Sequence, residues 1–331
     1  MDMPETSPTS TLPAAFERLR NELTRCIIGQ ADLVDRLLIA LLADGHLLVE
    51  GAPGLAKTTA IKELAARIEG DFHRIQFTPD LLPADLTGTE IYRPQQASFE
   101  FQRGPIFHNL LLADEVNRAP AKVQSALLEA MGERQVTVGR TTYPLPALFL
   151  VMATQNPIEQ EGTYPLPEAQ LDRFLMHVRI HYPDASAEAA ILKFARDRAR
   201  AELLHTEAPA RCLTQAQIFA ARAEVLALHL APPLEDYMVQ LTLATRAPQH
   251  YGEDVARWIA YGASPRGTIA LDRCARAHAW LRGRDFVTPE DVHAVAHDVL
   301  RHRVLLSYEA EAEGVTPDKI IDALLVRVPL P

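Results

Sequence analysis

A short Gly- and Pro-containing segment, residues 51–58, has the residue types that bind phosphate groups. It reads GAPGLAKT and stands between a strand-like apolar run and a run of helix-forming residues. Gly51 and Gly54 allow backbone N–H groups to approach an anion closely, and a helix N-terminus behind them favours negative charge. Lys57 would reach the β- and γ-phosphates of a nucleotide, and Thr58 would ligate Mg²⁺.

One position in this segment departs from the usual G-x-x-x-x-G-K-[ST] spacing. Ala56 stands where the second Gly is expected. Alanine tolerates a helix-start conformation, so the loop can still form. An ordinary Gly/Pro turn between a strand and a helix has the same pattern, and the rest of the chain has to decide between the two interpretations.

Two adjacent carboxylates, Asp114 and Glu115, end an apolar run that begins at residue 109. A buried parallel strand has this pattern, with its functional residues at the carboxyl end. Asp114 would hold Mg²⁺ through water, and Glu115 would polarise an attacking water. A strand that leads into an exposed acidic turn is the alternative. The phosphate-binding segment that precedes it at a suitable distance favours the catalytic interpretation.

Three polar residues further along the chain could complete such a site. Asn156 ends the apolar run 148–155, where it could position a water or cap the following turn. Arg173 precedes another strand-like run, and a surface salt bridge is its alternative role. Arg266 lies in the first turn of a predicted helix, where a cation opposes the helix dipole. That local penalty indicates another purpose for Arg266, such as binding phosphate.

Taken in this order, the segments resemble the AAA+ ATPases. They are most similar to the MoxR family, in the clade that also contains magnesium-chelatase ATPase subunits and MCM helicases. Ala at position 56 is usual in MoxR proteins. The resemblance covers nearly the whole chain and rests on residues 51–58, 112–120, 153–157, 161–174 and 264–267.

The resemblance implies a role for each of these residues. Lys57 and Thr58 would belong to Walker A, Asp114 and Glu115 to Walker B, and Asn156 would be sensor 1. Arg266 would be sensor 2, acting from the C-terminal domain, and Arg173 an arginine finger, acting on a neighbouring subunit's nucleotide. Arg118 could touch a neighbouring subunit or be solvated. The nucleotide-binding residues implied are Ile28, Gly29 and Gln30 beside the adenine, and Gly51, Ala52, Pro53, Gly54, Leu55, Ala56, Lys57, Thr58 and Thr59.

These elements predict an α/β fold: a P-loop NTPase (AAA+) core with a parallel sheet at residues 13–183, followed by a smaller all-α lid domain at residues 184–331. The nucleotide would lie between the two domains. Residues 1–12 are acidic and rich in Ser, Thr and Pro, which predicts a disordered tail. Alternating apolar and polar residues around a turn predict β-hairpin insertions at residues 89–103 and 135–145. Helices are expected at residues 14–26, 185–204, 214–228, 234–247, 264–281 and 292–302, whereas residues 324–328 fit a helix or a short strand.

The composition limits the possible partners. The chain has 331 residues and a formal net charge of -10, which gives no general attraction to DNA or anionic lipid. The tip of the first hairpin, residues 94–98, contains no Lys or Arg. No apolar run is long enough to span a bilayer. The three cysteines are far apart in the sequence, which indicates reduced thiols and a cytoplasmic protein.

The resemblance implies Mg²⁺-dependent hydrolysis of ATP to ADP in a homo-oligomeric, hexameric ring. Such a ring would remodel or activate client proteins, or assist cofactor insertion, with a partner that carries a von Willebrand factor A domain. A nucleic-acid motor of the same clade, a nucleotide-gated scaffold and a P-loop small-molecule kinase are the alternatives. The hairpin tip and net charge disfavour the motor, and the presence of Glu115, Asn156 and Arg173 disfavours the scaffold. A small-molecule kinase is disfavoured because it would not need Asn156, Arg173 and Arg266.

Overall fold

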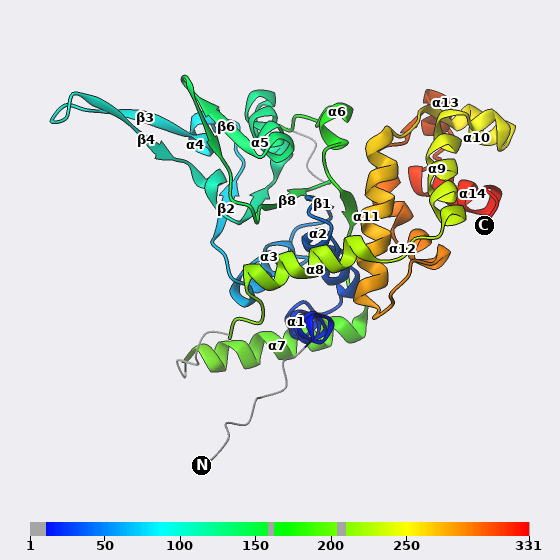
Figure 1. Cartoon of the computed structure of the whole chain (residues 1–331), viewed down its shortest axis with the longest axis horizontal. Coiled ribbons are helices and arrows are strands. Elements are labelled where there is room, and N and C mark those ends of the chain that lie inside the picture. Colours follow the sequence, from blue (N-terminus) through cyan, green and yellow to red (C-terminus); the bar gives the residue numbers. More distant parts are fainter. Residues whose placement is uncertain (1–10, 158–161, 204–209, 331) are drawn as a thin grey trace, which may run out of the picture.

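A five-stranded parallel sheet forms the centre of the protein, in the order β2–β5–β8–β1–β9 (Figure 1). The computed structural model describes residues 11–157, 162–203 and 210–330. The four strands that the sequence predicts for this sheet are present. Strand β2 was not predicted. The carboxyl ends of parallel strands meet at one edge, where the polar residues were expected to gather. The strands are β1 (Leu47–Glu50), β2 (Phe72–Gln76), β5 (Leu110–Asp114), β8 (Leu150–Gln155) and β9 (Met176–Arg179).

Helices cover both faces of this sheet, because successive side chains of a strand point to opposite faces. Leu110 and Leu112 of β5 are buried in one core, and Leu111 and Ala113 in the other. The first core contains residues of α1 (Leu12–Cys26), α2 (Ala31–Leu42) and α3 (Lys57–Arg67), and the second contains residues of α4 (Pro83–Thr87) and α5 (Ala121–Glu133). The predicted α/β core is confirmed.

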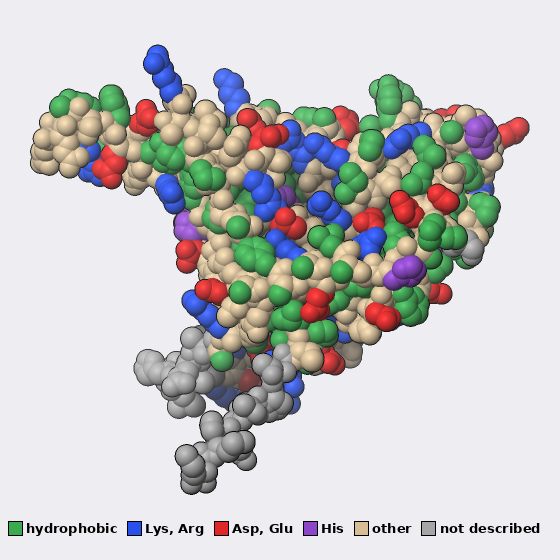
Figure 2. Space-filling view, viewed as in Figure 1, with side chains coloured by type: hydrophobic (Ala, Val, Ile, Leu, Met, Phe, Trp, Pro, Cys, Tyr) green, Lys and Arg blue, Asp and Glu red, His purple; other side chains and the backbone are tan. Residues whose placement is uncertain are grey.

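Two β-hairpins extend from the core, as the sequence predicts. They are β3 (Gly88–Arg93) with β4 (Ser98–Arg103), and β6 (Gln135–Val138) with β7 (Thr141–Pro144). Phe101 stacks on Tyr143 with ring centroids 4.1 Å apart, so the two hairpins support each other. The first hairpin projects beyond the body, where Tyr92 and Phe99 are 51% and 69% exposed (Figures 1 and 2).

The second half of the chain is helical. Helices α9 to α14 form a bundle beside the core, and α7 and α8 lie next to the α1–α3 layer (Figure 1). Residues 324–328, for which the sequence fits a helix or a short strand, lie largely in a helix. A two-stranded sheet of β10 (Ile259–Tyr261) and β11 (Leu305–Leu306) was not predicted, nor were α10 and α13. The helices are α6 (Glu168–Leu171), α7 (Ala185–Leu203), α8 (Gln215–Ala227), α9 (Pro232–Arg246), α10 (Glu253–Trp258), α11 (Pro265–Leu281), α12 (Pro289–Leu300), α13 (Tyr308–Ala312) and α14 (Pro317–Arg327).

The bundle shares its hydrophobic core with the α1–α3 side of the sheet, since buried residues of α9, α11 and α12 join the same cluster. The division of the chain near residue 183 remains a prediction. The expected tail lies outside the described residues, apart from Thr11 and Leu12, where α1 begins. No helix in the described part of the chain has the length and apolar character needed to cross a membrane.

Candidate active site

The loop between β1 and α3 has an unusual backbone. Gly54 and Ala56 both have left-handed conformations, with φ of 84° and 59°. Ala56 is the residue that precedes α3, so the helix-start conformation expected for it is wrong, although the loop forms. An L-residue in this region costs roughly 1–2 kcal/mol. Such strain is typical of functional loops held by their surroundings.

Close packing at the start of the loop explains Gly51. A Cβ atom there would lie 2.4 Å from Cγ1 of Ile180, so only glycine fits against β9 and its extension. The Lys57 ammonium donates to the carbonyls of Gly51 and, at 3.3 Å, Gln155. Lys57 therefore lies over the carboxyl ends of β1 and β8, at the edge predicted for the site.

The surroundings of Lys57 have opposing effects on its charge. Burial lowers the pKa of Lys57, whereas the carboxylates of Asp114, Glu115 and Glu50 act in the opposite direction. The carboxylates thus favour the charged form of Lys57, which is the form that can bind a phosphate.

Thr154 connects the two acidic residues at the end of β5. Its hydroxyl donates to Asp114 Oδ1 at 2.6 Å and accepts from the Glu115 backbone N–H at 2.9 Å. Glu115 has a left-handed φ of 56°, which turns its side chain away from the line of the strand. Thr154 was not predicted as a site residue, although it lies near the end of β8, two residues before Asn156.

Strand β2 supplies three further contacts to the acids. Arg74 donates to Asp114 Oδ2 through Nη2 at 2.7 Å and Nε at 3.1 Å. Gln76 accepts from Arg74 at 3.0 Å and donates to Glu115 Oε2 at 2.8 Å. Arg118 lies 3.0 Å from the same Glu115 oxygen, so within this chain it pairs with Glu115. Arg74 and Gln76 share one face of β2 by the two-residue repeat of a strand.

A cavity of about 610 Å³, which we name the loop cavity, brings most of the predicted residues together. The predicted residues Gly29, Gly51 and Ala52 do not line it. The predicted residues that line it are Ile28, Gln30, Pro53, Gly54, Leu55, Ala56, Lys57, Thr58, Thr59, Asp114, Glu115 and Asn156.

Helix α7 forms the opposite wall of the loop cavity. Ile191, Phe194 and Ala195 line it, together with Arg198. These residues were not predicted to belong to the site, although the i, i+3 and i+4 spacing of Ile191, Phe194 and Ala195 marks one apolar face of a helix. Of the described residues beyond 183, only residues of α7 line the cavity. The nucleotide would therefore lie between the core and α7, and not against the α9–α14 bundle.

Arg173 and Arg266 lie in a different place. They line a second cavity of about 460 Å³, which we name the arginine cavity, and among the described residues it shares no lining residue with the loop cavity. Gly132 makes room for Arg173, because a Cβ there would lie 2.4 Å from Arg173 Nη1. Figure 2 shows Lys and Arg side chains gathered over the middle of one face, between the hairpins and the helical bundle. The charged lining residues are Arg134, Arg173, Arg266, Arg273, Arg303, Asp44 and Asp172.

A buried ion pair fixes the floor of the arginine cavity. Arg303, whose side chain is 2% exposed, donates to Asp172 Oδ1 at 2.8 Å and to the Phe174 carbonyl at 2.6 Å. The other Asp172 oxygen accepts from the Ser264 hydroxyl at 2.8 Å and lies 3.7 Å from Arg266. Asp172 thus joins the segment that bears Arg173 to the start of α11.

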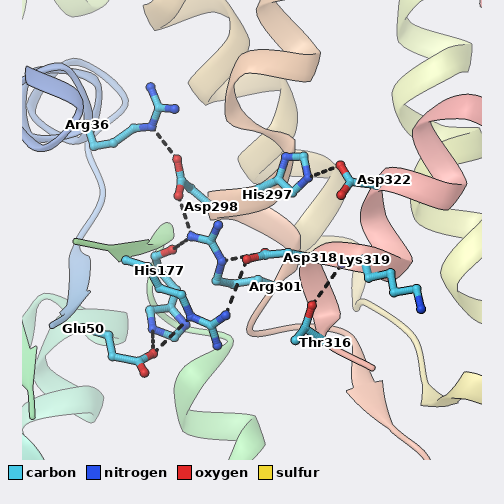
Figure 3. Close-up of polar contacts among 11 residues, drawn as sticks. Arg36, Glu50, His177, His297, Asp298, Arg301, Thr316, Asp318, Lys319 and Asp322 are labelled. Atoms are coloured by element: carbon cyan, nitrogen blue, oxygen red, sulfur yellow. Dashed lines mark hydrogen bonds and ion pairs between the residues drawn. The ribbon is translucent and has the colours of Figure 1, made fainter. Parts of the chain in front are cut away.

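Glu50, next to the phosphate-binding loop, leads into a polar network that reaches the helical bundle (Figure 3). His177 Nε2 lies 2.8 Å from Glu50 Oε2, and this contact, with help from Arg179, lowers the pKa of Glu50 to about 2. Arg179 lies 3.4 Å from Asp318 of α14, which in turn accepts from Arg301 at 2.9 Å. Strand β1 is therefore joined to α14 by charged groups.

Known proteins match this chain over most of its length. Residues 46–176 match the family model for the ATPase family associated with various cellular activities, and residues 253–324 match the AAA lid domain. The chain is 49% identical over 318 residues to chaperone MoxR1 of Mycobacterium tuberculosis, covering 96% of this chain and 82% of that protein. It is 36% identical over 332 residues to protein MoxR of Paracoccus denitrificans, covering 96% and 97%. The chain belongs to the MoxR family of AAA+ ATPases.

A solved structure supports the same assignment to the MoxR family. A proposed ATPase from Cytophaga hutchinsonii is 46% identical and superposes with a TM-score of 0.87, covering 97% of this chain and 96% of that one. The predicted resemblance is confirmed. As a MoxR protein, the chain is a chaperone-like ATPase that binds and hydrolyses ATP.

Proposed function

We propose that this MoxR protein hydrolyses ATP at sites completed between neighbouring subunits of a ring. The separation of the loop cavity from the arginine cavity carries the proposal. One cavity has the residue types that bind nucleotide and activate water, and the other is lined by more arginines than carboxylates. A head-to-tail interface repeated around a closed ring would bring the two together at every junction. The family resemblance implies six subunits.

The loop cavity would bind the nucleotide. The N–H groups of the loop and Lys57 would hold the phosphates. Ile28 would contact the adenine from one side, and Ile191 and Phe194 of α7 from the other. The volume of about 610 Å³ lies within the range of small-molecule sites.

The donor set in the loop cavity also fits Mg²⁺. Thr58 offers a hydroxyl oxygen and Asp114 a carboxylate, which are the hard oxygen ligands that Mg²⁺ prefers. When bound, Mg²⁺ neutralises charge on the β- and γ-phosphate oxygens. Glu115 would accept hydrogen bonding from the attacking water and polarise it, and Asn156 would orient that water.

Arg173 and Arg266 would both act on the nucleotide of the neighbouring subunit. Cations aimed at the terminal phosphate stabilise the charge that spreads over it during transfer. Arg266 was expected to act from the C-terminal domain. Its contact with Asp172, on the segment that carries Arg173, supports action across the same interface as Arg173.

Hydrolysis would move the hairpins against a client protein. The exposed Tyr92 and Phe99 support a protein client, because such side chains bury apolar surface on contact. Residues 94–98, at the tip of this hairpin, include no Lys or Arg for a phosphate backbone, and Arg93 beside the tip is paired with Glu100. By resemblance, the partner carries a von Willebrand factor A domain, and the outcome is client remodelling, activation or cofactor insertion.

ATP turnover per subunit, measured against protein concentration with Mg²⁺, tests this proposal. A cooperative rise is expected, because the active site forms only when two subunits meet. Size measurement on the same samples should show assembly over the same concentration range. A constant turnover from a monomer would contradict the proposal.

A further inference from the structure

Arg74 holds the carboxylate that is proposed to help bind Mg²⁺. Both of its donating groups, Nε and Nη2, are directed at one oxygen, Asp114 Oδ2, at 3.1 and 2.7 Å. The other oxygen of Asp114 accepts from Thr154 at 2.6 Å. The Asp114 side chain is only 11% exposed, so protein groups provide most of its contacts.

The same guanidinium belongs to a chain of hydrogen bonds that reaches the second acid. Arg74 Nη2 also donates to Gln76, and Gln76 donates to Glu115. Arg74 therefore does not depend on Asp114 alone for its position. Its side chain is 45% exposed, which leaves it room to turn toward solvent, but turning would break its hydrogen bonds to Asp114 and Gln76.

Two cationic groups that use one carboxylate compete with each other. An arginine at hydrogen-bonding distance neutralises the carboxylate and repels a nearby divalent cation. Asp114 is the carboxylate that, with Thr58, gives the loop cavity its Mg²⁺ donor set. The binding free energy of Mg²⁺ at Asp114 is therefore less favourable, because Mg²⁺ must either displace Arg74 from the carboxylate or bind against its positive charge.

We propose that Arg74 is a positioning residue that opposes Mg²⁺ at Asp114 and so sets how strongly Mg²⁺ and nucleotide binding depend on each other. This inference rests on the proposed Mg²⁺–nucleotide site. Arg74 keeps Asp114 aligned through its two donors, and the metal enters with the phosphates of the nucleotide, whose negative charge offsets the repulsion.

The test is the ratio of two dissociation constants for a fluorescent ADP derivative, one measured in EDTA and one at saturating Mg²⁺. This ratio is the coupling between metal and nucleotide, and it does not depend on hydrolysis. Arg74→Gln should raise the ratio roughly three- to tenfold, as expected from removing one screened charge beside a divalent ion. Arg74→Lys, which keeps the charge but loses the paired donors, should fall between Gln and wild type.

Arg93→Gln is the matched control, because it removes the same charge from an exposed ion pair on the first hairpin. Its ratio should equal that of the wild type. A ratio in Arg74→Gln that is unchanged or lower, or one that Arg93→Gln reproduces, would overturn the inference. Thermal unfolding in EDTA should show both variants folded, since both arginine side chains are exposed and a glutamine can take their place in solvent. Wild-type protein that binds no ADP under either condition would instead refute the proposed function, and the inference with it.

Discussion

The loop cavity and the arginine cavity differ in the charges around them. Two cations and three carboxylates line the loop cavity, whereas five arginines and two aspartates line the arginine cavity. Burial lowers the pKa of both Lys57 and His46, but nearby carboxylates oppose this effect at Lys57, whereas Arg134 adds to it at His46. We therefore propose that acid and metal chemistry belongs to one cavity and stabilisation of anions to the other, so that neither cavity alone would be a complete ATPase site.

Removing Arg173 should have the largest effect on turnover. Arginine fingers contribute roughly 10³–10⁵ in related phosphoryl transfers, so Arg173→Ala should lower ATP turnover by about that factor. Because Arg173 lies outside the loop cavity, ADP affinity should stay near that of the wild type. Steady-state hydrolysis and fluorescent ADP binding check both parts.

Arg196→Ala is the control for Arg173→Ala, since Arg196 is an exposed arginine of α7 that lines neither cavity. It should leave turnover unchanged. Near-normal turnover in Arg173→Ala would remove this residue from the site and with it the main distinction between the cavities.

Glu115→Gln should lower turnover through a change in the loop cavity. Loss of a general base lowers turnover by roughly 10²–10⁴, while the loop still binds ATP. The variant should therefore hold ATP in a stable assembly, which size measurement with and without ATP would detect. Hydrolysis at the wild-type rate would show that Glu115 does not activate water.

The pH dependence of stability tests the burial of His46 beside the arginine cavity. Burial, with a contribution from Arg134, lowers the pKa of His46 to about 4, and His46 Nδ1 accepts from the Val151 N–H at 3.0 Å. Between pH 6.5 and 4 the unfolded chain binds a proton at His46 that the folded chain does not. Stability from this group is complete above pH 6.5 and declines toward pH 4, by about 3 kcal/mol at most.

His46→Asn keeps an acceptor for Val151 but does not titrate. Urea unfolding at several pH values should give a flatter profile for this variant than for the wild type. Parallel profiles would show that His46 is not the group responsible.

Arg266→Ala should have the smallest of these effects. Asp172 lies 3.7 Å from Arg266 and offsets part of its charge, so we expect turnover to fall by roughly 10–100-fold, less than for Arg173. Fluorescent ADP affinity should again change little. A loss of ADP binding as large as the loss of turnover would place Arg266 at its own subunit's nucleotide and weaken the distinction between the cavities.

The sequence predicted the elements that depend on local patterns. Distinctive residues at fixed spacing mark the loop before α3, the two acids at the end of β5 and both hairpins. The structure contains each of these features. Helix α7 was also predicted, but its role as a cavity wall was not. That role depends on which neighbour the apolar face of α7 meets, and a single helix pattern does not contain this information.

The features that were missed depend on contacts between distant segments. Arg74 and Asp114 are 40 residues apart and meet only because β2 and β5 are paired in register. Asp172 and Arg303 are 131 residues apart and join the core to the bundle. A charged residue in a sequence shows no partner, so neither Arg74 nor Arg303 stood out from an ordinary surface cation.

Mixing two inactive variants tests the central claim most directly. In a one-to-one mixture of Glu115→Gln and Arg173→Ala, an intact Glu115 faces an intact Arg173 at one subunit interface in four, so turnover should recover to about a quarter of the wild-type value. Co-expression of the two chains ensures that mixed rings form. Recovery to that level, with each variant alone inactive, is the predicted result. Mixed assemblies that remain inactive would contradict an active site completed between subunits.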